Sequence, residues 1–335
     1  MLPAILGLSG LALTDAERGL IRAADPAGFI LFGRNVGDPA QLRALTDSLR
    51  EVSGRADLPI LVDQEGGRVA RLGPPHWPAF PAPWRFSELY ARAPISAIEA
   101  ARVNGEAIAV TLAEAGINVD CAPLLDVAQE GAHDVIGDRA LGAEPMQVAA
   151  LGRAVLDGLE AGGVLGMVKH IPGHGRVRAD PHGELPIVEA TRDELAADLA
   201  PFRALADAAL AMAAHLLYPA WDPLLPASAS PTIIAEVIRG EIGFDGLLLS
   251  DDIGMGALSG PVAVRAQAAI AAGCDLALHC SGVAAENEAI AAALGGMAAA
   301  ATARLERALA RIAGKASAKG HEALAAKRDA LLAYA

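Results

Sequence analysis

Eight apolar runs of strand length alternate with segments of helical pattern along this 335-residue chain. The apolar runs cover residues 4–8, 28–32, 59–62, 117–121, 165–170, 210–215, 247–251 and 275–280. The helical segments cover 14–24, 39–54, 96–115, 145–161, 191–208, 231–242, 262–272 and 283–294. Strands that are apolar throughout are typical of a parallel sheet covered on both faces. Eight β/α units therefore predict an α/β fold, a (β/α)₈ TIM barrel, in a single domain. We expect the barrel over residues 1–296 and a C-terminal helical extension, 297–335, packed on it.

Composition excludes several classes of partner. The formal net charge of −13 disfavours binding to phosphate backbones and anionic lipids. No apolar run approaches the roughly 18–20 residues that span a bilayer, and the first thirteen residues lack the basic start of a signal peptide. The three cysteines are odd in number and lie mostly in strand-like runs, which is typical of buried thiols in a reducing compartment. We expect a cytoplasmic protein that binds neither nucleic acid nor membrane.

The densest group of polar candidates follows the fifth apolar run. Five ionisable side chains lie within fourteen residues: Lys169, His170, His174, Asp180 and His182. Barrel active sites form where strands end and the following loops begin. Residues 165–184 therefore predict a strand that delivers reactive groups to a loop.

Two features of this stretch have competing interpretations. His170 and His174 have the spacing of a zinc-binding pair on a helix, but Pro172 and Gly173 between them prevent a helix. We therefore expect no metal and interpret His174 as a residue that shapes the loop. Lys169 is either a buried ion-pair partner or a ligand contact. Side chains alternate along a strand, so Lys169 and His170 can both reach a ligand only if the strand breaks at once, as Pro172 and Gly173 allow.

Two further motifs place carboxylates where acid–base or nucleophilic chemistry needs them. Asp180 precedes His182 by two residues in a turn, where a carboxylate can orient an imidazole and stabilise its charged form. An ordinary Asx turn is the alternative. Asp251 and Asp252 follow the seventh apolar run. Alternation predicts that only one of them faces the barrel mouth while the other caps local structure, and periodicity does not choose between them.

Taken together, these stretches resemble glycoside hydrolase family 3, in particular its bacterial single-domain β-N-acetylhexosaminidases. The resemblance runs from about residue 4 to residue 280, and the matching motifs lie at 31–35, 62–71, 136–139, 169–175, 180–182 and 250–255. Ile171 and Gly254 depart from the family pattern, but neither is at a catalytic position. Residues 297–335 carry no recognisable family motif.

The resemblance implies a retaining hydrolase that removes terminal β-linked N-acetylglucosamine from peptidoglycan-derived muropeptides. By the family pattern, Asp251 is the nucleophile, and His182, held by Asp180, is the general acid/base. The implied sugar-binding side chains are Asp63, Arg71, Arg139, Lys169 and His170. No metal or organic cofactor is implied. We expect a monomer or a weak dimer, and the preferred aglycone is not predicted.

Three alternatives remain at this point. A lysine at a strand end is what a Schiff-base aldolase uses, so Lys169 could serve that chemistry. A barrel that binds sugar without turnover is the second. Within the glycosidase class, phosphorolysis is the third, because a histidine acid/base does not repel an incoming phosphate as a carboxylate would.

Overall fold

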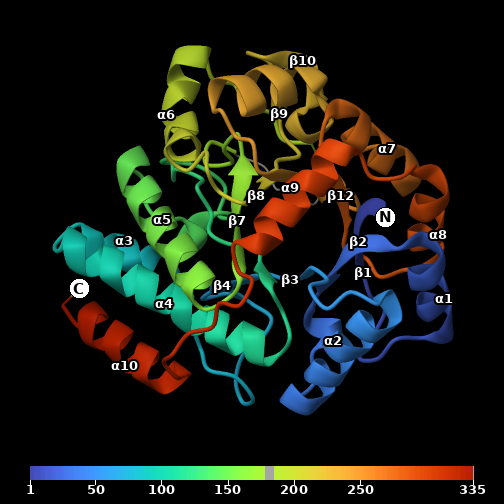
Figure 1. Ribbon diagram of the computed structural model, residues 1–335. Helices are drawn as coiled ribbons and strands as arrows, with labels where there is room; N and C mark the ends of the chain where they lie inside the picture. Colours follow the sequence, from blue (N-terminus) through green and yellow to red (C-terminus); the bar gives the residue numbers. More distant parts are fainter. Residues whose placement is uncertain (178–184, 335) are drawn as a thin grey trace.

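The computed structural model describes residues 1–177 and 185–334 and shows a closed barrel of eight parallel strands (Figure 1). Around the barrel the order is β1–β12–β11–β8–β7–β6–β3–β2. The strands are β1 (Leu2–Gly7), β2 (Pro26–Leu31), β3 (Ile60–Val62), β6 (Val119–Asp120), β7 (Leu165–Ile171), β8 (Leu210–Ala213), β11 (Leu247–Asp252) and β12 (Leu276–His279). Each lies within or beside one of the eight apolar runs, so the predicted (β/α)₈ barrel is confirmed.

The helices that follow the strands form the outer layer. They are α1 (Asp15–Ala24), α2 (Pro39–Ser53), α4 (Pro94–Glu114), α5 (Pro145–Ala161), α6 (Arg192–Ala204), the π-helix η4 (Ile233–Glu241), α7 (Val262–Ala272) and α8 (Ala284–Ala293). Two of them begin with a capping box, in which the N-cap hydroxyl and the glutamate three residues later satisfy each other's backbone N–H groups. Thr14 and Glu17 start α1 in this way, and Thr191 and Glu194 start α6.

The C-terminal extension contains α9 (Ala299–Ala310) and α10 (His321–Leu332). Helix α9 crosses the barrel in Figure 1 and contacts β11. Its Leu305 packs with the leucines at the starts of the strands, including Leu165 and Leu210. The N-terminal end of the barrel is therefore closed by apolar side chains, and α9 lies over this end of the strands. Helix α10 packs on α4 and α3.

Three short elements had no strong signal in the sequence. Helix α3 (Trp84–Tyr90) precedes α4, and two hairpins follow barrel strands: β4 (Gln64–Gly66) with β5 (Val69–Ala70), and β9 (Leu217–Tyr218) with β10 (Asp222–Pro226). Short 3₁₀ turns complete the chain: η1 (Gly33–Asn35), η2 (Gly137–Arg139) and η3 (Ala227–Ala229). None of the helices in the described part of the chain has the length and apolar character needed to cross a membrane.

Candidate active site

A cavity of about 700 Å³ opens at the carboxyl ends of the barrel strands. Six of the eight residues predicted for the site line it, namely Asp63, Arg71, Arg139, Lys169, His170 and Asp251. They come from β3, β5, η2, β7 and β11 or from the residues directly after them. The other two, Asp180 and His182, lie outside the described residues. One side of the barrel thus collects groups that are up to 188 positions apart in the sequence, from Asp63 to Asp251.

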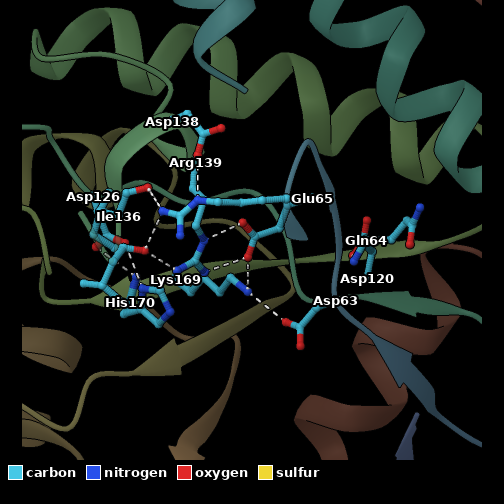
Figure 2. Close-up of polar contacts among 12 residues, drawn as sticks. Asp63, Gln64, Glu65, Asp120, Asp126, Ile136, Asp138, Arg139, Lys169 and His170 are labelled. Atoms are coloured by element: carbon cyan, nitrogen blue, oxygen red, sulfur yellow. Dashed lines mark hydrogen bonds and ion pairs between the residues drawn. The ribbon is translucent and has the colours of Figure 1, made fainter. Parts of the chain in front are cut away.

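Lys169 is the centre of a buried chain of charges (Figure 2). Its ammonium lies 3.0 Å from Asp63 Oδ1 and 2.7 Å from Glu65 Oε1. Arg139 donates two hydrogen bonds of 2.8 Å to the two oxygens of Glu65. Arg71 donates to Asp63 Oδ2 at 3.1 Å. The interpretation of Lys169 as a buried ion-pair partner is therefore confirmed; it also lines the cavity, and its contact with a ligand stays a prediction.

These contacts fix the ionisation states of Asp63, Glu65 and Lys169. Burial alone would raise the pKa of Asp63, but Lys169 and Arg71 hold it at about 2. The pKa of Glu65 is likewise lowered, because Lys169 and Arg139 outweigh the effect of its burial. Burial would lower the pKa of Lys169, but Asp63 and Glu65 raise it well above the ordinary range. The cavity therefore presents fixed cations and a fixed carboxylate at neutral pH.

Asp126 organises the loop after β7. His170 Nδ1–H donates to Asp126 Oδ2 at 2.8 Å, and the backbone N–H groups of His170 and His174 donate to Oδ1 at 3.1 and 2.7 Å. Burial opposes ionisation of Asp126, but His170 and the other donors lower its pKa to about 2. Bonded in this way at Nδ1, the His170 ring is oriented with Nε2 as its remaining polar atom. His174 lies beside it, with its ring centre 5.3 Å away.

Asp251 and Asp252 differ in what holds them. Asp252 Oδ1 accepts hydrogen bonds from the backbone N–H groups of Gly254 and Cys280 at 2.9 and 3.1 Å, which is a structural role. Asp251 Oδ1 accepts one backbone hydrogen bond, from Asp252 at 2.7 Å. Burial would raise the pKa of Asp251, but the nearby imidazole of His170 contributes to a net lowering. Asp251 is thus ionised at neutral pH, and its carboxylate accepts fewer backbone hydrogen bonds than that of Asp252.

Asp252 has the local capping role expected for one residue of the pair, but both residues of each pair border the cavity. Both Asp251 and Asp252 line the cavity, because the pairing of β11 with β12 shifts register between Leu249 and Asp252. Lys169 and His170 also both line it, and the pairing of β7 with β8 shifts between Lys169 and Ile171. Strand β7 continues to Ile171, so the irregularity comes before Pro172 and not at it.

Gln64 holds the hairpin that carries Glu65. Its side-chain Oε1 accepts the backbone N–H groups of Arg71 and Leu72 at 2.9 and 3.0 Å, and its Nε2 donates to Leu72 O at 2.8 Å. Its own backbone N–H donates to the buried Asp120 Oδ1 at 3.0 Å. Gly66, which ends β4, and Gly67, which begins the turn, have positive φ angles of 97° and 58°. These contacts join the two ends of the hairpin and so position Asp63 and Arg71 together.

The chain matches a known family over most of its length. The protein-family model described as "Glycosyl hydrolase family 3 N terminal domain" matches residues 5–314. This chain belongs to glycosyl hydrolase family 3. The resemblance found in the sequence is confirmed, and so is the predicted enzyme class, a glycoside hydrolase.

Curated relatives of this family 3 chain carry the name beta-hexosaminidase. The protein of Alkalilimnicola ehrlichii is 43% identical over 284 residues, which cover 83% of this chain and 80% of the relative. That of Chromobacterium violaceum is 38% identical over 338 residues, which cover 99% and 92%. Among solved structures, NagZ from Neisseria gonorrhoeae in complex with N-trifluoroacetyl-D-glucosamine superposes with a TM-score of 0.86 at 30% identity, covering 99% of this chain and 97% of that one.

Sequence reasoning predicted no role for Glu65 or Asp126, although both hold side chains of the candidate site in this family 3 chain. Both were visible as carboxylates after a strand, but their partners are 74 and 44 positions away, Arg139 and His170 respectively. Across residues 1–177 and 185–334, no group of three or more histidines, cysteines or carboxylates has the geometry to hold a metal ion.

Protonation of His174 should weaken the fold in mild acid. Burial, with a contribution from His170, lowers the pKa of His174 to about 4, whereas an unfolded histidine titrates near about 6.5. Between these values the unfolded chain binds the extra proton, so stability falls as pH decreases, by up to about 1.4 kcal/mol per pH unit. Asp63 and Asp126 have lowered values of about 2, so they stabilise the fold above pH ~4 and lose that effect only at lower pH.

We expect His174→Gln to remove this share of the pH dependence, because glutamine stays neutral throughout the range. The measurement is urea denaturation of both proteins at several values between about pH 4.5 and 7.5. Equal slopes of unfolding free energy against pH in the two proteins would show that another group takes up the proton.

Proposed function

We propose that this protein is a retaining exo-β-N-acetylglucosaminidase with Asp251 as its nucleophile. The observation that supports this most directly is the position of Asp251, an ionised carboxylate at the end of β11 that lines the same cavity as Lys169, His170 and Arg139. A nucleophile in glycoside hydrolysis must be ionised and must face the sugar carbon that it attacks. Asp252, whose carboxylate is engaged by two backbone N–H groups, is less available for attack.

The proposed reaction has two displacements. In the first, Asp251 attacks the anomeric carbon while the His182 imidazolium gives its proton to the glycosidic oxygen, and the aglycone departs as an alcohol. In the second, neutral His182 takes a proton from water, which attacks the same carbon and releases Asp251 and the sugar. Two displacements at one carbon retain its configuration. Asp180 would stabilise the imidazolium that the first step consumes and the second restores.

The ion-paired side chains around Lys169 are suited to binding the sugar. Asp63 has two oxygens that can accept hydrogen bonds from adjacent hydroxyl groups, and bonds to a charged acceptor are stronger than neutral ones. Lys169, Arg71 and Arg139 offer donors to hydroxyl oxygens and to the acetamido carbonyl. His170 would contribute through its Nε2 atom, because Nδ1 is engaged by Asp126. These groups are held in place by one another before any sugar binds, which reduces the entropy cost of binding.

We further propose that the substrates are muropeptides with terminal N-acetylglucosamine, handled in the cytoplasm during peptidoglycan recycling. A solved structure supports N-acetylglucosamine as the sugar. It is a family 3 beta-N-acetylglucosaminidase from Paenibacillus, 32% identical to this chain. The cysteines, Cys121, Cys274 and Cys280, are all buried and free, which suits a reducing compartment.

The aldolase alternative conflicts with the charge state of Lys169. A Schiff-base lysine needs a neutral amine at working pH, and therefore a lowered pKa. The pKa of Lys169 is raised by Asp63 and Glu65.

Phosphorolysis is distinguished from hydrolysis by product analysis in phosphate buffer. Phosphorolysis releases sugar 1-phosphate, whereas hydrolysis releases free sugar.

The acetamido group of the substrate is expected to dominate specificity. We predict that a chromogenic β-N-acetylglucosaminide exceeds the matching β-glucoside by roughly tenfold to a hundredfold in kcat/KM, the scale of one or two lost polar contacts. The measurement is a comparison of initial rates with the same leaving group on both sugars. Equal values would contradict the N-acetylglucosaminidase assignment without affecting membership of the family.

A further inference from the structure

The C-terminal helix α10 lies beyond the part of the chain that the family model matches. That match ends at residue 314, whereas α10 covers His321–Leu332. Figure 1 shows α10 at the outer edge of the molecule, against α4. Two of its side chains nevertheless point into the protein, since Leu324 and Arg328 are buried. Burying an arginine costs free energy unless the guanidinium is hydrogen-bonded or paired with other groups.

Arg328 contacts two elements at once. Its Nη1 donates a hydrogen bond to Asn104 Oδ1 of α4 at 3.2 Å, and its guanidinium lies 5.9 Å from the centre of the Phe80 ring. The ring of His321, at the start of α10, meets the same phenyl ring edge-on at 5.6 Å. Phe80 is itself buried and belongs to the main core. Helix α10 therefore holds Phe80 from two positions.

Phe80 in turn supports the hairpin that carries Glu65. The backbone N–H of Gly67 donates to Phe80 O at 2.9 Å. A Cβ atom on Gly66 would lie 2.3 Å from Pro81 O and 3.4 Å from Phe80 Cβ, so the two segments are in direct backbone contact. Glu65 precedes this turn by one residue and bridges Lys169 and Arg139. Displacement of Phe80 would therefore move Glu65.

A second route leads to the same carboxylate. Asn104, which accepts from Arg328, lines a small internal cavity of about 20 Å³ together with Glu65 and Asp120. A hydrogen bond from Arg328 fixes the amide of Asn104 at this wall. Arg328 thus reaches the surroundings of Glu65 from the α4 side as well as through Phe80.

We propose that α10 is a positioning element for the sugar site, with Arg328 and Phe80 as its positioning residues. By fixing the 64–82 segment, they set the place of Glu65, and through it the cations Lys169 and Arg139 in the cavity. The effect on sugar binding rests on the proposed function, whereas the effect on the hairpin does not. We expect α10 to affect sugar binding and not the chemical steps, because Asp251 belongs to β11 on another part of the rim.

The test compares Arg328→Ala with Lys327→Ala. The control residue is its neighbour on α10, is exposed, and forms its ion pair with Glu99 of α4. We expect Arg328→Ala to raise the inhibition constant of free N-acetylglucosamine roughly tenfold, the scale of one lost hydrogen bond with a charged partner, with a smaller change in kcat. Lys327→Ala should leave both values unchanged. Phe80→Leu keeps most of the apolar volume and serves as the second variant if Arg328→Ala does not fold.

Hydrogen exchange gives a readout that needs no turnover. The amides of Gly67, Arg71 and Leu72 are hydrogen-bonded within the hairpin and its Phe80 contact. They should exchange faster in Arg328→Ala and Phe80→Leu than in Lys327→Ala. Unchanged exchange at these amides in folded variants would overturn the proposal, whether or not the wild type cleaves N-acetylglucosaminides. A fall in kcat with unchanged inhibition constant and unchanged exchange would also overturn it. An inactive wild type with faster exchange in the variants would refute the proposed function and leave the positioning role supported.

Discussion

Asp251→Ala is expected to lower kcat/KM for an N-acetylglucosaminide by roughly 10⁴-fold or more, the scale on which losing a reacting group acts. The reason is that alanine cannot form the covalent glycosyl-enzyme on which retention depends. The variant should remain folded, because the Asp251 carboxylate accepts only one backbone hydrogen bond in the structure described, from its neighbour. Steady-state kinetics with an activated glycoside, together with a thermal melt, measure both parts of the prediction.

Trapping identifies the residue directly. A 2-acetamido-2-deoxy-5-fluoro donor should form a stable adduct with the wild type, and peptide mass analysis should place it on Asp251. Asp252→Asn is the matched control, since it changes the adjacent carboxylate but keeps the proposed nucleophile. It should still be labelled at Asp251, with a cost in stability from the weakened contacts to Gly254 and Cys280. An adduct on Asp252 or Glu65 would show that the assignment is wrong.

His182→Ala is expected to cripple cleavage of a disaccharide while sparing a dinitrophenyl glycoside. Removing a general acid typically costs about 10²–10⁴-fold when the leaving group needs a proton. A dinitrophenolate leaves as a stable anion and does not need one. The measurement is the ratio of kcat/KM for the two substrates in wild type and variant. If both substrates slow by the same factor, His182 serves binding or structure, and the acid is another group on the rim.

Asp180→Asn separates the dyad from an ordinary turn. Asparagine keeps the shape of the side chain but removes the negative charge that favours imidazolium, so the pKa of His182 should fall. The alkaline limb of the kcat/KM profile reports loss of the protonated acid, and it should therefore move to lower pH. An unshifted limb in this variant would mean that Asp180 only shapes the loop.

The barrel could be predicted from the sequence because its signal is local. Each strand is an apolar run bounded by helix starts such as Thr14 and Thr191, and eight repeats of one pattern leave few alternative folds. The cavity followed from the fold, because strand ends of a parallel barrel meet on one side. The position of six of the eight predicted residues around it needed no knowledge of their partners.

The partners themselves could not be predicted, because they depend on contacts between distant segments. Nothing near Glu65 indicates that Arg139 and Lys169 will meet it, and nothing near Phe80 indicates Arg328. The register shifts near Asp251 and Lys169 could not be predicted for a related reason: they come from pairing with neighbouring strands. Helix α9 shows the same limit, since an Ala-rich segment does not specify whether it packs on the side of a barrel or over its end.

The chain from Arg71 through Asp63, Lys169 and Glu65 to Arg139 constrains how this lineage can evolve. Glu65 is the most constrained member, because its loss would leave the largely buried guanidinium of Arg139 without an ion-pair partner. That costs about 3–5 kcal/mol, a large share of the roughly 5–15 kcal/mol that keeps a domain folded. We therefore expect a single substitution at residue 65 to pass through a poorly folded intermediate. We expect related proteins with a new sugar preference to have replaced residues 65 and 139 together. The alternative is substitution at cavity-lining positions such as Arg68, which pairs with Asp138 and not with these five side chains.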